Sequence, residues 1–135
     1  MELKPIGLFA GLSEDDLKKL NKQMREVRHQ QGAEIMVHGK DGVGFLVIVE
    51  GEAEVTTGDG RHRKLGPGDY FGEMALLDQQ GRSADITART DLVLAAVPEW
   101  GFKQFLGEHP EITYRLLQTL SRRLREAEEA QKSRG

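Results

Sequence analysis

Hydrophobic residues along the chain change their period twice, and this predicts a helix, then a series of strands, then helices again. The first helix is expected to begin after Ser13, a good N-cap residue, and to run to about Gln23. Leu17, Leu20 and Met24 fall on one face of this helix. That face should therefore pack against the rest of the chain.

From about residue 25 to residue 97, short runs of β-branched residues alternate with Gly, Asp and Pro. This rhythm is typical of an antiparallel β-roll or sandwich. The candidate strands are Glu34–Val37, Gly44–Val49, Glu52–Thr57, Lys64–Leu65, Ser83–Ala88 and Leu92–Pro98. The run Gly-Asp-Gly at residues 58–60 is a hairpin signal, because glycine adopts a positive φ without steric cost. A hairpin tip is therefore expected near Asp59.

After Pro98 the pattern returns to a helical period. The apolar positions of the next helix are Trp100, Phe102, Phe105 and Leu106. Gly107 is expected to end this helix, and Pro110 is expected in the first turn of the following one.

The last helix is predicted from Glu111 to about Gln131. It carries a short coiled-coil-like seam, whose residues are spaced 3, 4 and 3 apart: Leu117, Leu120, Leu124 and Ala127. The charged residues that flank this seam are expected to form a solvated face.

The composition narrows the class of protein. A length of 135 residues predicts a single domain, residues 1–135. Its expected parts are an N-terminal helical segment (1–24), a jelly-roll-like antiparallel β-roll (25–98) and C-terminal helices (99–133). The formal net charge of −3 gives nucleic acid no general attraction. The chain contains no cysteine, which excludes thiolate zinc sites and fits the cytoplasm. No apolar stretch is long enough to cross a membrane, and no signal peptide is expected.

One stretch departs from ordinary strand and turn sequence. Residues 66–77 read Gly-Pro-Gly-Asp-Tyr-Phe-Gly-Glu-Met-Ala-Leu-Leu, and residues 81–84 read Gly-Arg-Ser-Ala. A 3′,5′-cyclic phosphate is a monoanion, so one bidentate guanidinium and a few backbone N–H groups can satisfy it. Arg82 would supply the guanidinium. Gly72, at the start of a short helical turn, would let backbone N–H groups approach the anion.

Glu73 is the candidate acceptor for a ribose 2′-OH, the free hydroxyl that remains after cyclisation. Arg82 between this carboxylate and the phosphate would offset both charges. Taken singly, a surface glutamate and a structural arginine are the more ordinary interpretations. Their combination in this stretch favours the functional interpretation.

Residues 66–84 resemble the phosphate-binding cassette of cyclic-nucleotide-binding domains. Such domains occur in catabolite-activator-type regulators, protein kinase A regulatory subunits and nucleotide-gated channels. The resemblance rests on Phe-Gly-Glu, Ala-Leu-Leu, a variable link and Arg-Ser-Ala within residues 71–84. Residues 8–13 and 45–55 resemble the family's N-terminal segment and central hairpin, so the likeness covers nearly the whole chain.

The resemblance implies a sensor module that binds a cyclic nucleotide and is not an enzyme. It implies phosphate contacts from Gly72, Ala75, Arg82 and Ser83, and a 2′-OH contact from Glu73. The predicted ligand-binding residues are Phe71, Gly72, Glu73, Met74, Ala75, Arg82, Ser83 and Ala84. No catalytic residue, metal or further cofactor is predicted, and the ligand is cAMP or cGMP.

Two positions bear on this assignment. Asp85 stands where many family members have an uncharged residue, and it adds a negative charge near the anion site unless strand alternation turns it outward. Ser83 leaves the base open. A hydroxyl after the arginine favours cGMP in some branches of the family, whereas bacterial activators with serine there prefer cAMP. We expect cAMP rather than cGMP.

The last helix has two possible roles. In the family, the stretch corresponding to Glu111 onward moves to cover the base, so Leu117, Leu120 and Leu124 could pack there as a lid. They could instead form half of a homodimer seam, which is the preferred interpretation. The family's activators place a DNA-binding helix-turn-helix after this helix, but the sequence ends at Gly135. We therefore expect no DNA binding by this chain and an effector that is a separate protein or a missing part of a longer one.

Two other functions compete with nucleotide sensing. The first is a cupin-like metalloenzyme, since cupins are also small β-rolls. The positions of the histidines argue against a metal site, because they are scattered along the sequence. Each is expected at the surface or at an interface: His29, His38, His62 and His109. The second is a roll that has lost its ligand and serves only protein interaction. The presence of both Glu73 and Arg82 argues against that loss.

Overall fold

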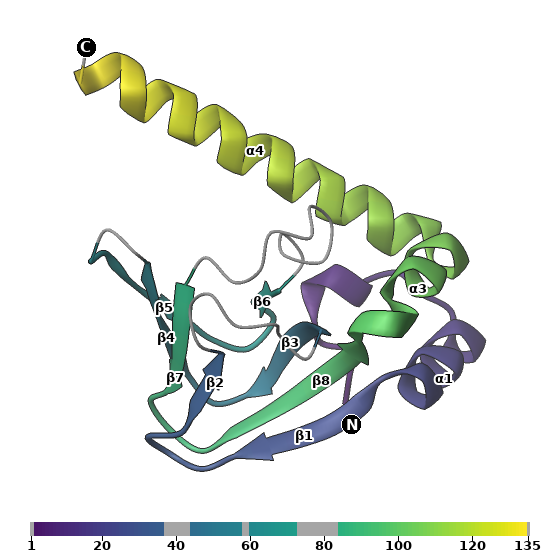
Figure 1. Ribbon diagram of the computed structural model, residues 1–135. Helices are drawn as coiled ribbons and strands as arrows, with labels where there is room; N and C mark the ends of the chain where they lie inside the picture. The colour runs from purple at the N-terminus through teal and green to yellow at the C-terminus, as the bar shows by residue number, and fades with distance from the viewer. Residues whose placement is uncertain (1, 37–43, 58–59, 73–83, 135) are drawn as a thin grey trace.

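The computed structural model describes residues 2–36, 44–57, 60–72 and 84–134 (Figure 1). In this part of the chain the strands form two four-stranded antiparallel sheets, the shorter helices lie at one end of them, and the long C-terminal helix runs from that end across the sandwich (Figure 1). The first sheet has the spatial order β1 (Arg25–His29), β8 (Leu92–Pro98), β3 (Gly44–Glu50) and β6 (Tyr70–Phe71). The second has the order β2 (Glu34–Met36), β7 (Ala84–Ala88), β4 (Ala53–Thr57) and β5 (His62–Leu65). The helical elements are η1 (Gly7–Phe9), α1 (Glu14–Gln23), η2 (Glu99–Gly101), α3 (Phe102–Glu108) and α4 (Pro110–Arg134). This arrangement confirms the predicted β-roll with flanking helices.

The hydrophobic core lies on both faces of the first sheet. Successive side chains of β3 point to opposite faces. Phe45 and Val47 join a cluster that includes the helices, whereas Leu46 and Ile48 join a cluster between the two sheets. Because both faces are covered, β3 is a continuous apolar run and not an alternating one. The same reason explains β8, which is buried from Leu92 to Val97.

The six predicted strands are confirmed, and their described ends differ from the prediction by at most two residues. Two predicted ends, Val37 and Ser83, lie outside the described residues. β1 and β6 were not predicted. β1 reads Arg-Glu-Val-Arg-His and lies at the edge of the first sheet, where only one side is paired. Its register with β8, from Arg25 opposite Ala96 to His29 opposite Leu92, holds a polar segment in an extended form. Local sequence does not predict such a strand, because its pairing partner is almost seventy residues away.

The predicted hairpin is confirmed by the pairing of β4 with β5. The register runs from Ala53 opposite Leu65 to Thr56 opposite His62, so the connection falls where the Gly-Asp-Gly run was noted. Asp59, the expected tip, lies outside the described residues.

The first helix agrees with its prediction. The Ser13 hydroxyl accepts a hydrogen bond from the Asp16 backbone N–H at 3.1 Å, which is an N-cap. Leu17 and Leu20 are buried against the roll.

Two predictions about the segment after Pro98 were wrong. Gly107 does not end its helix, because α3 continues to Glu108 and the His109 backbone N–H still donates to the Phe105 carbonyl. Trp100 is not a packing residue, since it lies in η2 with 87% of its surface exposed. Pro110 does begin α4, as predicted.

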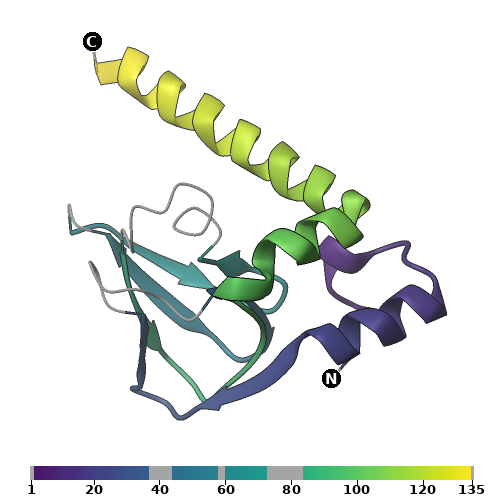
Figure 2. The same ribbon diagram turned by 45° about the vertical axis from the view of Figure 1, so that its right-hand side comes forward.

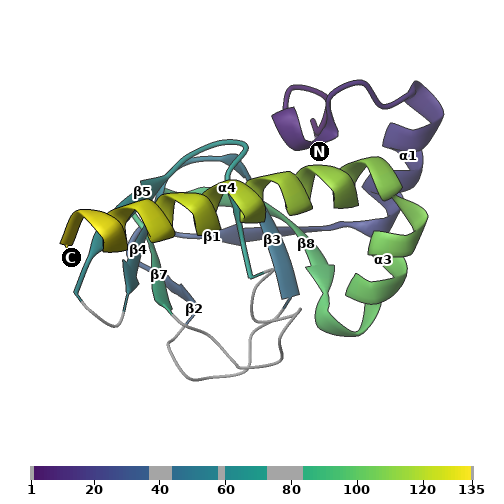
Figure 3. The same cartoon turned by 90° about the horizontal axis from the view of Figure 1, so that it is seen from above.

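Helix α4 is 25 residues long and therefore extends about 37 Å. Its first turns are anchored by Ile112 and Leu116, which are buried in the cluster that includes the helices. From there it runs across the sandwich and its C-terminal half rises away from the sheets (Figures 2 and 3). None of the helices in the described ranges is long and apolar enough to span a membrane.

Candidate functional site

A tight turn leads into the predicted site. Residues 66–69 read Gly-Pro-Gly-Asp, and the Asp69 backbone N–H donates to the Gly66 carbonyl at 3.0 Å. Proline at the second position and Gly68 at the third, with φ of +92°, are the requirements of a type II turn. The Asp69 carboxylate accepts a further hydrogen bond from the Gly66 N–H at 2.8 Å. The turn is fixed to β3 by Ile48, whose N–H donates to the Asp69 carbonyl.

The short strand β6 connects this turn to the site. Phe71 pairs with Leu46 of β3 and is buried between the two sheets. Tyr70 points to the opposite face and is buried in the cluster that includes the helices. Gly72 follows with φ of +97°, a conformation in which a residue with a Cβ is strained. The strand therefore fixes Gly72, the first of the predicted phosphate contacts.

The other end of the predicted site is the start of β7 in the second sheet. Ala84 pairs with Thr57 and Asp85 with Thr56 of β4. The Asp85 side chain is exposed and that of Ile86 is buried, as strand alternation requires. Asp85, the position that departs from the family pattern, thus faces solvent.

The structure describes the positions of only some residues of the predicted site. Phe71 and Gly72 lie at the end of β6, and the Ala84 backbone lies at the start of β7. The other predicted contacts lie outside the described residues: Glu73, Met74, Ala75, Arg82 and Ser83. Their segment connects an edge strand of the first sheet to an inner strand of the second.

Helix α4 contacts β6 beside the predicted site. The guanidinium carbon of Arg123 lies 5.7 Å from the centre of the Tyr70 ring, within the range of a cation–π interaction. The Tyr70 hydroxyl is buried and makes no hydrogen bond to any residue in the described part of the chain. Buried hydroxyl groups without a hydrogen-bond partner are uncommon in folded proteins.

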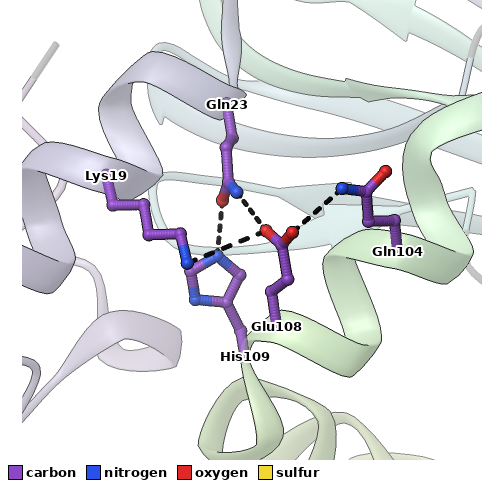
Figure 4. Close-up of polar contacts among 5 residues, drawn as sticks. All are labelled: Lys19, Gln23, Gln104, Glu108 and His109. Atoms are coloured by element: carbon purple, nitrogen blue, oxygen red, sulfur yellow. Dashed lines mark hydrogen bonds and ion pairs between the residues drawn. The ribbon is translucent and has the colours of Figure 1, made fainter.

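A second polar cluster joins α1 to the α3–α4 junction (Figure 4). The His109 Nε2–H donates to the Gln23 side-chain oxygen at 2.5 Å, and the Gln23 amide nitrogen donates to the Glu108 carboxylate. Gln104 donates to the other Glu108 oxygen at 2.9 Å, and the Lys19 ammonium lies 4.0 Å from the first. These hydrogen bonds, above all that from Gln104, lower the pKa of Glu108.

His109 corrects one expectation. It is not a surface histidine, because it is buried against the Phe105 ring, with the two ring centres 4.9 Å apart. Burial is the main cause that lowers its pKa, and Lys19 adds to the effect. His29 is half-buried, His62 is exposed, and His38 lies outside the described residues. No signal in the sequence pointed to the contact with Gln23, because the two residues are 86 positions apart.

No group of three or more His, Cys, Asp or Glu side chains suited to a metal ion occurs within the ranges that the structure describes. What those ranges do contain is a β-roll with capping helices and, directly after β6, Gly72 with a positive φ. These features define the class of small β-roll domains to which the sequence resemblance also pointed.

The comparison with known families agrees. The family model described as "Cyclic nucleotide-binding domain" matches residues 26–109, more than half of the chain. This chain belongs to the cyclic nucleotide-binding domain family.

Three similar proteins illustrate the family. The chain is 29% identical over 128 residues to the CRP-like cAMP-activated global transcriptional regulator of Mycobacterium tuberculosis, which covers 91% of this chain and 57% of that protein. It is 37% identical over 111 residues to a cAMP-dependent protein kinase regulatory subunit of Eremothecium gossypii, covering 82% of this chain and 24% of that protein. The crystal structure of Thermus thermophilus Catabolite Activator Protein superimposes with a TM-score of 0.82 and 31% identity, covering 93% of this chain and 61% of that one. The chain thus spans less than two thirds of the length of these relatives.

Proposed function

We propose that this chain is a sensor domain that binds a 3′,5′-cyclic nucleotide, cAMP in preference to cGMP, without converting it. The proposal is carried by the family match over residues 26–109, because that range contains the whole of residues 71–84. The preference for cAMP is supported by the Mycobacterium tuberculosis and Eremothecium gossypii relatives, whose names both include cAMP.

In this proposal the cyclic phosphate is held by Arg82 and by backbone N–H groups after Gly72. A guanidinium makes two parallel hydrogen bonds to phosphate oxygens, which neutralise a monoanion without a metal. The positive φ of Gly72 supports the role of the backbone, because it turns the chain sharply at the end of β6. Ala75 and Ser83 would complete the phosphate contacts, and Glu73 would accept from the 2′-OH. Phe71, Met74 and Ala84 would line the site.

The test is a calorimetric titration of the full chain with cAMP, cGMP and 5′-AMP. We expect saturable binding of a cyclic nucleotide and no binding of 5′-AMP, whose phosphate is a dianion without the ring. Arg82→Ala should lose about 2–5 kcal/mol of binding free energy, because it leaves the bound anion unpaired. Glu73→Gln should lose less, since an amide oxygen still accepts from a hydroxyl.

The matched control is Arg63→Ala, which removes an exposed arginine from β5 and should leave the affinity unchanged. Unchanged binding in Arg82→Ala would refute the proposed site. Absence of any cyclic-nucleotide binding would favour the alternative of a roll used only for protein interaction. Metal-dependent turnover of a small molecule would favour the cupin-like alternative.

We further propose that the chain forms a homodimer through the exposed side of α4 and signals to a separate effector in the cytoplasm, without contacting DNA or a membrane itself. Leu117 and Leu124 support the dimer, because they are 58% and 62% exposed on the same helix. Leu120, the third predicted seam residue, is half-buried and would lie at the edge of the interface. The net charge of −3 supports the absence of a DNA contact.

A further inference from the structure

A groove lies on the side of the molecule where α1, the end of β8, η2 and α3 meet. It encloses about 350 Å³. Its floor is largely apolar and its walls are polar, and the lining residues are Lys22, Gln23, Arg25, Val97, Pro98, Trp100, Gly101, Gln104, Phe105 and Glu108. Gln23, Gln104 and Glu108 form one wall and are held together by the hydrogen bonds described above (Figure 4). We call this feature the Trp100 groove.

The exposure of the Trp100 side chain has no explanation in the packing of the fold. Trp100 is the single tryptophan of the chain, and 87% of its surface is exposed. Tryptophan is highly buried on average, and it is enriched among the residues that dominate protein–protein binding energies. Its backbone is held by buried neighbours, Val97 before it and Phe102 after it. The backbone at Trp100 therefore loses little conformational entropy when a partner binds.

The charges around the Trp100 groove define the partner that would fit. Lys22 and Arg25 are both exposed at its rim, and neither forms an ion pair with a residue of the described ranges. The acidic residue of the lining, Glu108, already accepts from Gln23 and Gln104 and lies beside Lys19. The groove therefore presents uncompensated positive charge beside an apolar floor, in a chain whose net charge is −3.

We propose that the Trp100 groove docks an acidic peptide segment of a partner protein. In this segment one bulky aliphatic side chain lies against Trp100 and the apolar floor. Neighbouring Asp or Glu side chains pair with Lys22 and Arg25. Complementary charge of this kind steers association and fixes orientation, while the buried apolar contact supplies affinity. This docking is independent of the nucleotide site proposed above.

A nucleic acid fits the same surface less well. Two cations neutralise few phosphates, so they would supply little of the electrostatic affinity on which nucleic-acid binding depends. The apolar floor of Val97, Pro98 and Phe105 matches an aliphatic side chain better than it matches a hydrated phosphodiester chain.

The experiment titrates the full chain with short labelled peptides and records fluorescence anisotropy together with Trp100 emission. One peptide carries a leucine flanked by Asp and Glu, a second replaces that leucine by serine, and a third replaces the acidic residues by lysine. We expect the first peptide to bind, to shift Trp100 emission to the blue and to weaken with added salt. The second and third peptides should bind at least about tenfold more weakly, which equals about 1.4 kcal/mol.

The variants make the proposal falsifiable. The double variant Lys22→Glu/Arg25→Glu and the variant Trp100→Ala should each weaken the acidic peptide at least about tenfold, and both should fold normally because these side chains are exposed. Lys132→Glu, which makes one such charge reversal at the far end of α4, should leave binding intact. Equal binding of all three peptides, or unchanged affinity in the double variant, would overturn the proposal. So would binding of a labelled single-stranded oligonucleotide in place of the acidic peptide, or concentration-dependent burial of Trp100 in the protein alone, which would assign the groove to a second copy.

Discussion

Single residues of this domain are constrained by contacts that their neighbours in sequence do not reveal. Gly51, in the link between β3 and β4, has φ of +94°, and a Cβ there would come within 2.2 Å of the Asp91 carbonyl oxygen. Gly32 has a similar φ of +89° but open space around it. The two glycines therefore separate the effect of backbone conformation from the effect of a close approach.

We predict that Gly51→Ala lowers the free energy of unfolding by about 2–4 kcal/mol, because it adds a clash with backbone to the cost of a positive φ. Gly32→Ala should cost only about 1–2 kcal/mol, the part that comes from φ alone. Urea unfolding followed by circular dichroism measures both. Equal costs at the two positions would show that the approach to Asp91 does not matter.

His109 is the other residue whose environment decides its behaviour. Burial lowers its pKa below the ordinary value of 6.5, and the facing charges are Lys19 and Asp16 of α1 and Glu108 of α3. Lys19 lowers the pKa further, whereas the two carboxylates partly offset the effect of burial. The folded chain therefore binds a proton at His109 less readily than the unfolded chain does.

This difference predicts how stability depends on pH. The contribution of His109 to the free energy of unfolding is fully present above pH 6.5 and is lost as the pH falls from there through the lowered pKa of the folded state. In that range the slope of the unfolding free energy against pH corresponds to the uptake of at most one proton. Urea unfolding at a series of pH values measures that slope. His109→Gln should flatten it, whereas His29→Gln in β1 should retain it. An identical slope in the His109 variant would contradict the prediction.

Among the elements, the N-terminal segment and α4 are joined by one side chain. The Arg115 guanidinium donates to the Leu8 carbonyl at 2.7 Å and to the Ala10 carbonyl at 2.5 Å. These hydrogen bonds from the forked guanidinium hold η1 against α4. Leu8 and Phe9 of η1 are also buried in the cluster that includes the helices. α4 thus contacts η1 through Arg115 and β6 through Arg123.

We predict that Arg115→Ala lowers the free energy of unfolding by about 1.5–3 kcal/mol, the usual range for hydrogen bonds from a charged group. Arg115→Lys should recover only part of the loss, because an ammonium does not reproduce the planar fork. Arg122→Ala, on an exposed part of the same helix, should change stability by less than about 0.5 kcal/mol. The chemical denaturation midpoints of the three variants compare these outcomes directly. A midpoint for Arg115→Ala equal to that of Arg122→Ala would show that the Arg115 hydrogen bonds do not stabilise the fold.

At the scale of the whole molecule, α4 has one side committed to the roll and another side without a partner. Ile112 and Leu116 are buried, whereas Tyr114, Leu117 and Leu124 are more than half exposed. The exposed three have spacings of 3 and 7, which is the repeat of a helical seam. A second copy of the chain would cover them.

The proposed dimer predicts that Leu117→Glu/Leu124→Glu yields a monomer with unchanged unfolding free energy, because both side chains are already exposed in one chain. Sedimentation velocity at several concentrations measures the oligomeric state, and Gln131→Glu near the end of the helix is the charge control. A wild-type chain that stays monomeric at every concentration, with and without cAMP, would overturn the dimer. A wild-type monomer in which these leucines become protected only after cAMP is added would favour the lid.

Much of the fold could be predicted from local sequence. The apolar runs of β3 and β8, the Ser13 cap and the Gly-Asp-Gly hairpin each carry their own signal, and each is confirmed. β1 and β6 could not be predicted, because one is polar and the other is only two residues long, and both exist through pairing with distant strands. For the site, Phe71 ends β6 and Gly72 follows it with a positive φ, and the ligand-binding roles of all the predicted site residues stay predictions.

Apart from β1 and β6, the sequence by itself determined which segments are helix or strand, and it determined to which family the chain belongs, because period, capping and the residue 71–84 motif are local properties. Only the tertiary structure decided which side of each element is covered. It buried Ile112 and Leu116 but exposed Leu117 and Leu124, it left Trp100 in solvent, and it placed His109 against Gln23. The physical reason is that burial depends on the surface opposite a side chain, and that surface is supplied by residues far away along the chain.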